Sequence, residues 1–162
     1  MKLIIIMSYQ QESKHWLIRV KNGENFRNSK YPFWGVKRGN HGCIKTIVNK
    51  IKKGDILWFM TSKNYGGKLI GMSEYTYYYD REDEPLIRMN TYLNKEQNWK
   101  GEEDWDIQIH YENLYITEKQ NIKASVQCGG IILEYETFKD RGLPNLYNHY
   151  NNFKYYAEPK IF

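Results

Sequence analysis

Residues 53–76, KGDILWFMTSKNYGGKLIGMSEYT, hold the pattern that decides the fold. The residues Lys53-Gly54-Asp55 form a turn that leads into the apolar run at residues 56–60, which is typical of a strand. Asn64-Tyr65-Gly66-Gly67 is a hairpin turn, because Asn and Gly tolerate the backbone conformations that tight turns require. Residues 68–76 then return as a second strand. The stretch therefore predicts a β-hairpin.

Similar patterns elsewhere in the chain predict the remaining elements. Apolar, β-branched and aromatic residues predict further strands at residues 15–20, 31–36, 105–117 and 130–135. Apolar residues at helical spacing predict an amphipathic helix over residues 43–52, and shorter helical segments are expected at residues 24–30 and after Phe138. Strands outnumber helices, and no regular alternation of strand and helix is present. This predicts an α+β fold built on a small, barrel-like sheet of mixed or antiparallel strands, flanked by a few helices.

The sequence predicts one domain over residues 1–162. The length suits a single domain with its own core, and the chain shows no internal repeat, Pro-rich linker or low-complexity segment. Residues 1–14 are interpreted as an extension before the first strand of the domain. Residues 138–162, which are rich in Asn and Tyr, are interpreted as a divergent C-terminal tail.

Composition excludes several classes of protein. The mean hydropathy is −0.79, and no apolar run approaches the 18 residues of a membrane span, so no membrane partner is expected. The run at residues 3–7 is too short for a signal peptide, and two cysteines cannot form a disulfide framework. These features predict a protein of the cytoplasm, with the nucleus as the alternative. Aromatic residues make up 16% of the chain, more than a core of this size needs, so some are expected to line a site.

Charge is distributed unevenly along the chain. Up to Lys68 there are 14 basic and 3 acidic residues, a net charge of +11, whereas the rest has 10 basic and 16 acidic residues, a net charge of −6. Together the two parts give the overall +5. A solubilising, lysine-rich surface would account for this, but the asymmetry favours a face that binds a polyanion such as a nucleic acid.

Motifs for catalysis or for metal binding are missing from the sequence. The chain has no phosphate-binding or dinucleotide-binding glycine motif, no His-Glu-x-x-His and no Gly-x-Ser-x-Gly. The four histidines are scattered without ligand spacing, and Cys43 lies near His41 without a defined catalytic arrangement. We therefore expect a protein that is not an enzyme and that has no catalytic residue, metal site or cofactor.

The first half of the chain resembles the EVE domain, a PUA-like family related to the YTH readers of methylated adenine. The family's features occur in its order: an aromatic strand, a Trp-Gly-Val strand, a basic helix, a Lys-x-Gly-Asp turn and an Ile-Gly-x-x-Glu return strand. They cover residues 15–76, under half of the chain, and lie at His15–Val20, Phe33–Val36, Ile51–Phe59 and Gly67–Glu74. After Asp80, only residues 105–117 fit a later strand of the family.

The resemblance implies a PUA-like pseudo-barrel that binds a flipped-out, modified base in an aromatic pocket. Trp34 matches the pocket tryptophan, with a place in the core as the alternative. Asn22 lies where related readers have a polar residue facing the base edge, although Asn22-Gly23 is equally typical of a plain turn. Gly35 would let a flat ligand approach the backbone, so Trp34 is expected to face the pocket and Phe33 the core. By position alone, Tyr92 and Trp99 are candidates for the remaining cage, whereas Trp58 and Trp105 are expected in the core.

A set of basic residues follows the expected pocket strand and is predicted to contact phosphates. A solvated helix face is the alternative for this set, which comprises Lys37, Arg38, Lys45, Lys50, Lys52 and Lys53. The sequence therefore predicts a monomeric, non-catalytic module that reads a modified, methylated base in RNA or DNA, single-stranded or with the base flipped out. Two alternatives stay open: a PUA-like enzyme acting on RNA or nucleotides, and a module whose aromatic pocket takes a small ligand or a protein.

Overall fold

The computed structural model describes residues 12–82, 94–101, 105–117 and 119–162. Within these ranges, none of the helices is long and apolar enough to cross a membrane. The strands are β1 (His15–Arg19), β2 (Phe33–Val36), β3 (Ile56–Met60), β4 (Leu69–Asp80), β5 (Ile107–Ile116), β6 (Ile132–Glu134) and β7 (Glu158–Pro159). The α-helices are α2 (Glu24–Asn28), α3 (Cys43–Val48), α4 (Tyr135–Phe138) and α5 (Leu146–Tyr156). Short 3-10 segments are η1 (Asn40–Gly42), η2 (Lys63–Tyr65) and η4 (Asn94–Gln97).

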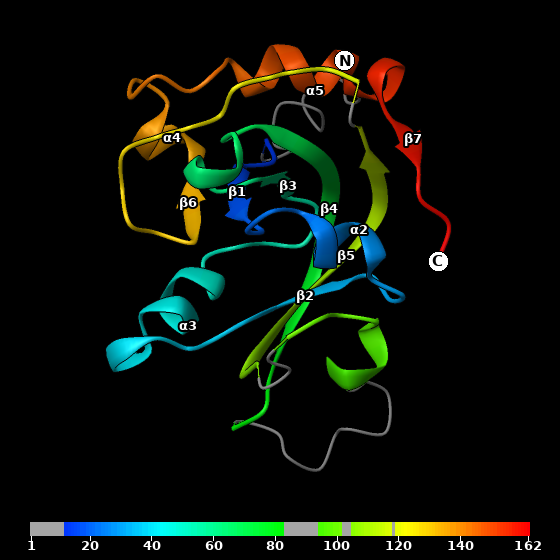
Figure 1. The fold of residues 1–162 in the computed structure, drawn as a ribbon. Coiled ribbons are helices and arrows are strands. Elements are labelled where there is room, and N and C mark those ends of the chain that lie inside the picture. The colour runs from blue at the N-terminus through cyan, green and yellow to red at the C-terminus, as the bar shows by residue number, and fades with distance from the viewer. Residues whose placement is uncertain (1–11, 83–93, 102–104, 118) are drawn as a thin grey trace, which may run out of the picture.

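One mixed sheet forms the framework of the molecule. Its strands lie in the order β2-β5-β4-β3-β1-β6, and β7 pairs with β5. Strands β1 and β3 run parallel, while the other described pairs are antiparallel. Figure 1 shows the sheet curled, with the long strands β4 and β5 bent along their length. The predicted α+β class and the mixed, curled sheet are confirmed.

Two element ends differ from the sequence prediction by four residues each. Helix α3 ends at Val48 rather than at residue 52, because Lys50 and Ile51 donate their N–H groups to the carbonyls of Ile47 and Val48, three residues back. Strand β4 continues to Asp80, because its last residues pair with β5 as far as Asp80 opposite Ile107. Asp80 therefore belongs to the sheet, four residues beyond the predicted end of this strand at residue 76.

Both faces of the central strands are buried, which explains their continuous apolar runs. On β1, Trp16 and Ile18 face one hydrophobic cluster, while Leu17 faces a second one. The second cluster is completed by Leu146 and Phe153 of α5, neither of which is exposed to solvent. Figure 1 shows α5 lying across the end of the sheet beyond β1 and β3. The segment interpreted as a divergent tail thus supplies one wall of the core.

The turn before β3 is fixed by the carboxylate of Asp55. Its Oδ2 accepts hydrogen bonds from the indole Nε1 of Trp16, at 3.0 Å, and from the backbone N–H of Lys52, at 3.0 Å. Its Oδ1 accepts from the backbone N–H of Lys14, at 3.1 Å. One side chain therefore ties the start of β1 to the turn that enters β3, which gives Asp55 a structural role.

Candidate functional site

A hollow with aromatic walls and polar residues at its rim lies at the end of β2. It has a volume of about 390 Å³, and we call it the tryptophan pocket. Three sets of residues line it: the β2 residues Trp34, Gly35 and Val36 with Lys37; Arg19, Lys21 and Ser62; and Trp105, Gly129, Gly130 and Ile131. None of these described lining residues is acidic. The pocket therefore combines flat apolar walls with positive charge, the combination expected for an aromatic anion.

The ring of Trp105 lies directly against the backbone of Gly35. A Cβ atom added at Gly35 would be 2.6 Å from Trp105 Cγ and 2.8 Å from its Cβ, distances shorter than any ordinary contact. The missing side chain at Gly35 therefore makes room for Trp105. The sequence analysis expected the ligand itself to use this space and placed Trp105 in the core, whereas Trp105 is partly exposed and lines the pocket.

Two lysine ammonium groups lie over the Trp105 ring. Lys21 Nζ is 5.6 Å and Lys37 Nζ is 5.9 Å from the ring centroid, within the range of cation–π attraction. Lys21 has a positive φ of 55°, an uncommon conformation for a residue other than glycine, and its carbonyl accepts a hydrogen bond from Ser62 N–H at 2.8 Å. The backbone thus fixes Lys21 beside the pocket instead of letting it follow the strand.

Arg19 holds the opposite wall in place. Its guanidinium donates hydrogen bonds to the carbonyls of Val126, at 2.8 Å, of Cys128, at 2.7 Å, and of Gly130. These partners are neutral carbonyls, so they fix the segment at residues 126–130 without cancelling the charge of Arg19. This wall of the pocket therefore adds to its positive potential.

Trp34 lies mainly in the core, although it also lines the pocket. Its side chain is 6% exposed, and its ring makes edge contacts with Phe26 and Trp99, with centroids 6.4 Å and 5.2 Å apart. Phe33 is also fully buried. The expectation that only one of these two neighbours is in the core is wrong, because Phe33 and Trp34 are both buried in the same cluster within the curled sheet.

The other predicted pocket residues lie apart from the pocket or outside the described residues. Trp99 is buried, and its Nε1 donates to Ser29 Oγ at 2.8 Å. Asn22 has the turn role left open by the sequence, because its Oδ1 accepts from Glu24 N–H at 3.0 Å. Neither is among the lining residues. Tyr92 lies outside the described residues. Of the predicted set, the structure brings Trp34 and Gly35 to the pocket.

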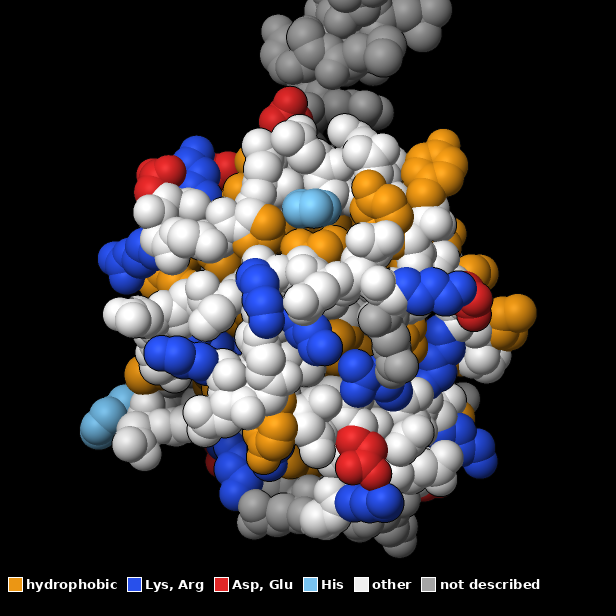
Figure 2. All heavy atoms as spheres, turned by 45° about the horizontal axis from the view of Figure 1, so that its top comes forward, with side chains coloured by type: hydrophobic (Ala, Val, Ile, Leu, Met, Phe, Trp, Pro, Cys, Tyr) orange, Lys and Arg blue, Asp and Glu red, His pale blue; other side chains and the backbone are white. Residues whose placement is uncertain are grey.

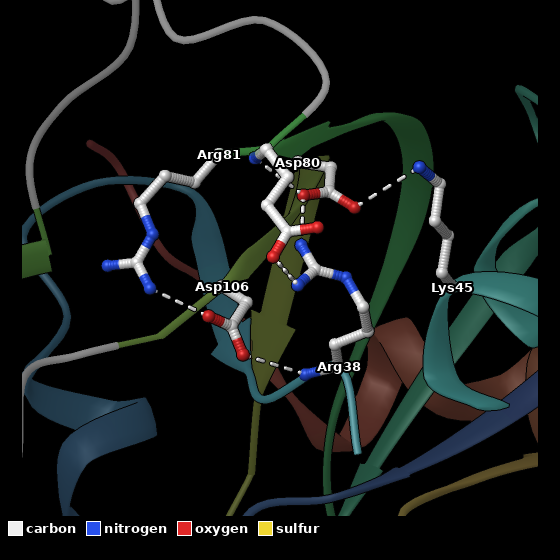
Figure 3. Close-up of polar contacts among 6 residues, drawn as sticks. Arg38, Lys45, Asp80, Arg81 and Asp106 are labelled. Carbon is white, nitrogen blue, oxygen red and sulfur yellow. Dashed lines mark hydrogen bonds and ion pairs between the residues drawn. The ribbon is translucent and has the colours of Figure 1, made fainter. Parts of the chain in front are cut away.

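Two of the predicted phosphate-binding residues take part in ion pairs around Asp80, whose side chain has no exposed surface (Figure 3). Arg38 pairs with Asp80 and, at 2.6 Å, with Glu82, and Lys45 Nζ lies 3.5 Å from Asp80 Oδ2. Burial raises the pKa of Asp80, but hydrogen bonds from Glu82 N–H and Arg38, with the charges of Arg38 and Lys45, lower it below its ordinary value. We call these residues, with Arg81 and Asp106, the ion-pair cluster.

Asp106 links the ion-pair cluster to the tryptophan pocket. One of its oxygens accepts from Arg81 Nη2 at 2.7 Å, and the other accepts from the backbone N–H of Arg38 at 3.0 Å. Arg38 follows Lys37 in the chain, and Asp106 follows Trp105. The bond therefore fixes the two chain segments that carry the cation and the ring of the pocket.

The remaining predicted cations lie in different surroundings. Lys37 lines the tryptophan pocket. Lys50 lies beside α3 on a separate hollow of about 300 Å³ with Trp16 and Ile47. Lys52 and Lys53 are exposed in the turn before β3. The structure thus divides the predicted set among the pocket, the ion-pair cluster, the hollow beside α3 and the turn before β3.

Two histidines are buried and uncharged at neutral pH. Burial lowers the pKa of His15 to about 4, despite the opposing charges of Asp55 and Glu136, and its Nδ1 accepts from Trp58 Nε1 at 2.8 Å. Burial also lowers the pKa of His110 to about 4, and Tyr77 stacks on its ring at 4.4 Å. Neither histidine lines the tryptophan pocket. Their protonation therefore concerns the stability of the fold.

Sequence reasoning did not assign several residues that line the pocket: Arg19, Lys21, Ser62, Trp105, Gly129, Gly130 and Ile131. The Gly129-Gly130 pair at the start of a predicted strand marks a place where the chain turns, but its proximity to Trp34 depends on the pairing of β1 with β6. No local pattern shows that Lys21 turns toward Trp105. These residues meet through tertiary structure.

Comparisons with known proteins do not assign the chain to a family. No family model matches it, and no curated protein matches it. The fold is similar to a solved structure described as that of a hypothetical protein from Leishmania major, with a TM-score of 0.37 and 13% sequence identity. That alignment covers 93% of this chain and 88% of the other. A likeness at this level carries no argument about fold family or function.

Proposed function

We propose that this chain is a non-catalytic nucleic-acid-binding module that takes an unstacked, modified base into the tryptophan pocket. We also propose that its curled mixed sheet is a PUA-like pseudo-barrel of the EVE type. The order of the sequence motifs over residues 15–76 supports this family, and the Trp-Gly-Val strand of the motif is β2, which borders the pocket.

The observation that carries the proposal is the placement of Trp105 between an apolar wall and two cations. A base has a flat aromatic face that stacks on an indole, and its phosphates attract ammonium groups. Lys21 Nζ and Lys37 Nζ lie 5.6 and 5.9 Å from the ring centroid, so a base stacked on the ring would lie close to positive charge. Aspartate and glutamate, which would repel phosphates, are absent from the described lining.

Preference for a methylated base follows from the apolar part of the lining. Val36, Ile131 and the edge of Trp34 offer surface on which a methyl group can be buried, which stabilises the complex by about 0.8 kcal/mol per methylene-sized group. Stacking contributes roughly 1–3 kcal/mol per base without regard to its identity. Extruding a base from a duplex costs a few kcal/mol, so a single strand is the favoured target.

The test is a fluorescence-anisotropy panel of modified and unmodified oligonucleotides, DNA and RNA, single- and double-stranded. Trp105→Ala should weaken binding roughly 5- to 150-fold, the equivalent of one lost stacking interaction. Tyr155→Ala is the matched control, because Tyr155 is 86% exposed on α5 and does not line the pocket. It should bind like the wild type.

Three results would contradict the proposal. Equal affinity of Trp105→Ala and wild type would place the site elsewhere, and equal affinity for modified and unmodified strands would remove the reader function. Conversion of a modified oligonucleotide into product by the wild-type protein would show an enzyme. Circular dichroism of Trp105→Ala should match the wild type, which keeps a binding loss separate from unfolding.

A further inference from the structure

A second hollow lies next to the tryptophan pocket. Its volume is about 510 Å³, and its lining residues are Lys63, Ser125, Gln127 and Arg141. All four are exposed and polar, two of them are cations, and none of these lining residues is acidic. We call it the Lys63–Arg141 hollow. Its chemistry suits phosphate oxygens, since it offers charge and hydrogen-bond donors without an aromatic wall.

Backbone contacts between two segments build this hollow. The N–H of Ala124 donates to the carbonyl of Gly67 at 2.7 Å, which joins residues 123–127 to the turn after η2. Gly67 has a φ of 54°, and a Cβ there would be 2.8 Å from Ser125 Cβ, so a glycine allows this close approach. Figure 1 shows the turn at residues 63–65 beside the segment at residues 119–130.

The positive charge around the Lys63–Arg141 hollow is not neutralised. Neither Lys63 nor Arg141 pairs with a carboxylate of the described chain, and Arg141 lies over the Phe138 ring, 5.0 Å from its centroid. Lys68 and Lys123 are directly opposite in an antiparallel bridge, an arrangement in which like charges destabilise the pair. Figure 2 shows that Lys and Arg side chains outnumber Asp and Glu side chains on the face that it draws. A bound polyanion would offset this repulsion.

The two hollows are lined by neighbouring residues of the same two chain segments. Ser62 lines the tryptophan pocket, and the next residue, Lys63, lines the Lys63–Arg141 hollow. On the other side, Gln127 lines the second hollow and Gly129, two residues later, lines the first. Consecutive Cα atoms are about 3.8 Å apart, so the hollows are within one nucleotide's reach of each other.

We propose that a nucleic-acid strand whose base enters the tryptophan pocket continues past Ser62 into the Lys63–Arg141 hollow, where these two cations bind the phosphate of a neighbouring nucleotide. The inference rests on the proposed function and adds the path of the strand. Tyr65, in the same 3-10 turn as Lys63, is 56% exposed and provides a ring on which the neighbouring base can stack. The ligand is therefore an oligonucleotide rather than a free nucleotide.

The test compares two double variants that remove the same charge. Lys63→Gln/Arg141→Gln alters the second hollow, and Lys52→Gln/Lys53→Gln alters exposed cations in the turn before β3. Binding is measured by anisotropy with a single strand of about ten nucleotides, a typical length for such sites, at several salt concentrations. A nucleoside monophosphate carrying the same preferred base is the short probe, measured by calorimetry.

We expect Lys63→Gln/Arg141→Gln to weaken oligonucleotide binding about tenfold. It should also lower the slope of log affinity against log salt by about 0.7, the value for one phosphate of a single strand. Its affinity for the monophosphate should equal that of the wild type, and Lys52→Gln/Lys53→Gln should change the slope less. Equal slopes of log affinity against log salt for the two double variants would contradict the proposed path of the strand. Loss of monophosphate binding in the first variant would overturn it too, by making the second hollow the nucleotide site. Both outcomes leave the Trp105 test of the proposed function intact, whereas a wild type that binds none of the probes overturns both proposals.

Discussion

The tryptophan pocket and the ion-pair cluster lie on adjacent residues of the same two segments but treat their cations differently. Arg38 and Lys45 face the buried Asp80, and Arg38 also pairs with Glu82. Lys21 lies over an indole ring, and Arg19 meets neutral carbonyls. The cations of the cluster are therefore paired with carboxylates within the fold, whereas Lys21 and Arg19 contact an uncharged ring and neutral carbonyls.

The largest effect on stability is expected from Trp34, the ring shared by the pocket and the core. Because its side chain is 6% exposed, Trp34→Ala should lower the free energy of unfolding by about 3–5 kcal/mol, the usual cost of truncating a buried aromatic residue. Trp105→Ala should cost less, because Trp105 is partly exposed. Urea denaturation of both variants checks the order. Equal losses would mean that Trp105 supports the core as much as Trp34 does.

A smaller loss is expected when the ion-pair cluster loses its buried anion. Asp80→Asn leaves Arg38 and Lys45 without that charge, and it should cost about 3 kcal/mol, the low end for removing one partner of a buried pair. Asparagine preserves the size of the side chain, so the loss reports charge. Urea denaturation at pH 7 provides the measurement, and a loss below 1 kcal/mol would show that solvent already screens the cluster.

The pH dependence of stability distinguishes the contribution of Asp80 from that of the buried histidines. The pKa of Asp80 in the folded protein lies below its ordinary 3.8, so its stabilising contribution is present above that pH and disappears as the pH falls through the folded value. The Asp80→Asn variant should not show this loss of stability as the pH falls. Both proteins should lose stability between pH 6.5 and about 4, because the unfolded chain protonates His15 and His110 while the folded chain does not. Denaturation midpoints measured from pH 7 to pH 3 distinguish the two ranges.

Local sequence patterns were sufficient to predict the helices and strands, but they were not sufficient to predict which residues form the tryptophan pocket. The hairpin at residues 53–76 follows from an apolar run, a Gly-rich turn and a return strand, and β3 and β4 confirm it. Trp34 could be predicted as a ring near a pocket only through the resemblance. Trp105 could not be assigned, because its position depends on β5 pairing with β2, which is more than 70 residues earlier, and on the missing side chain at Gly35. The ion pairs could not be predicted from local sequence either, because Arg38 and Asp80 are 42 residues apart.

The smallest expected effect is a change in the salt dependence of binding. It tests most directly whether the cations of the tryptophan pocket and of the ion-pair cluster differ. Lys21→Gln should lower the slope of log affinity against log salt by about 0.7, because a lysine at one phosphate of a single strand releases that fraction of a counterion. Arg38→Gln removes the same charge a few residues from the pocket but from a group paired with Asp80 and Glu82, so it should lower the melting temperature and leave the slope unchanged. Anisotropy titrations with one oligonucleotide at four or so salt concentrations resolve a difference of this size. If Arg38→Gln lowers the slope as much as Lys21→Gln does, the cluster also contacts the ligand, and pairing within the fold does not decide which cations bind phosphate.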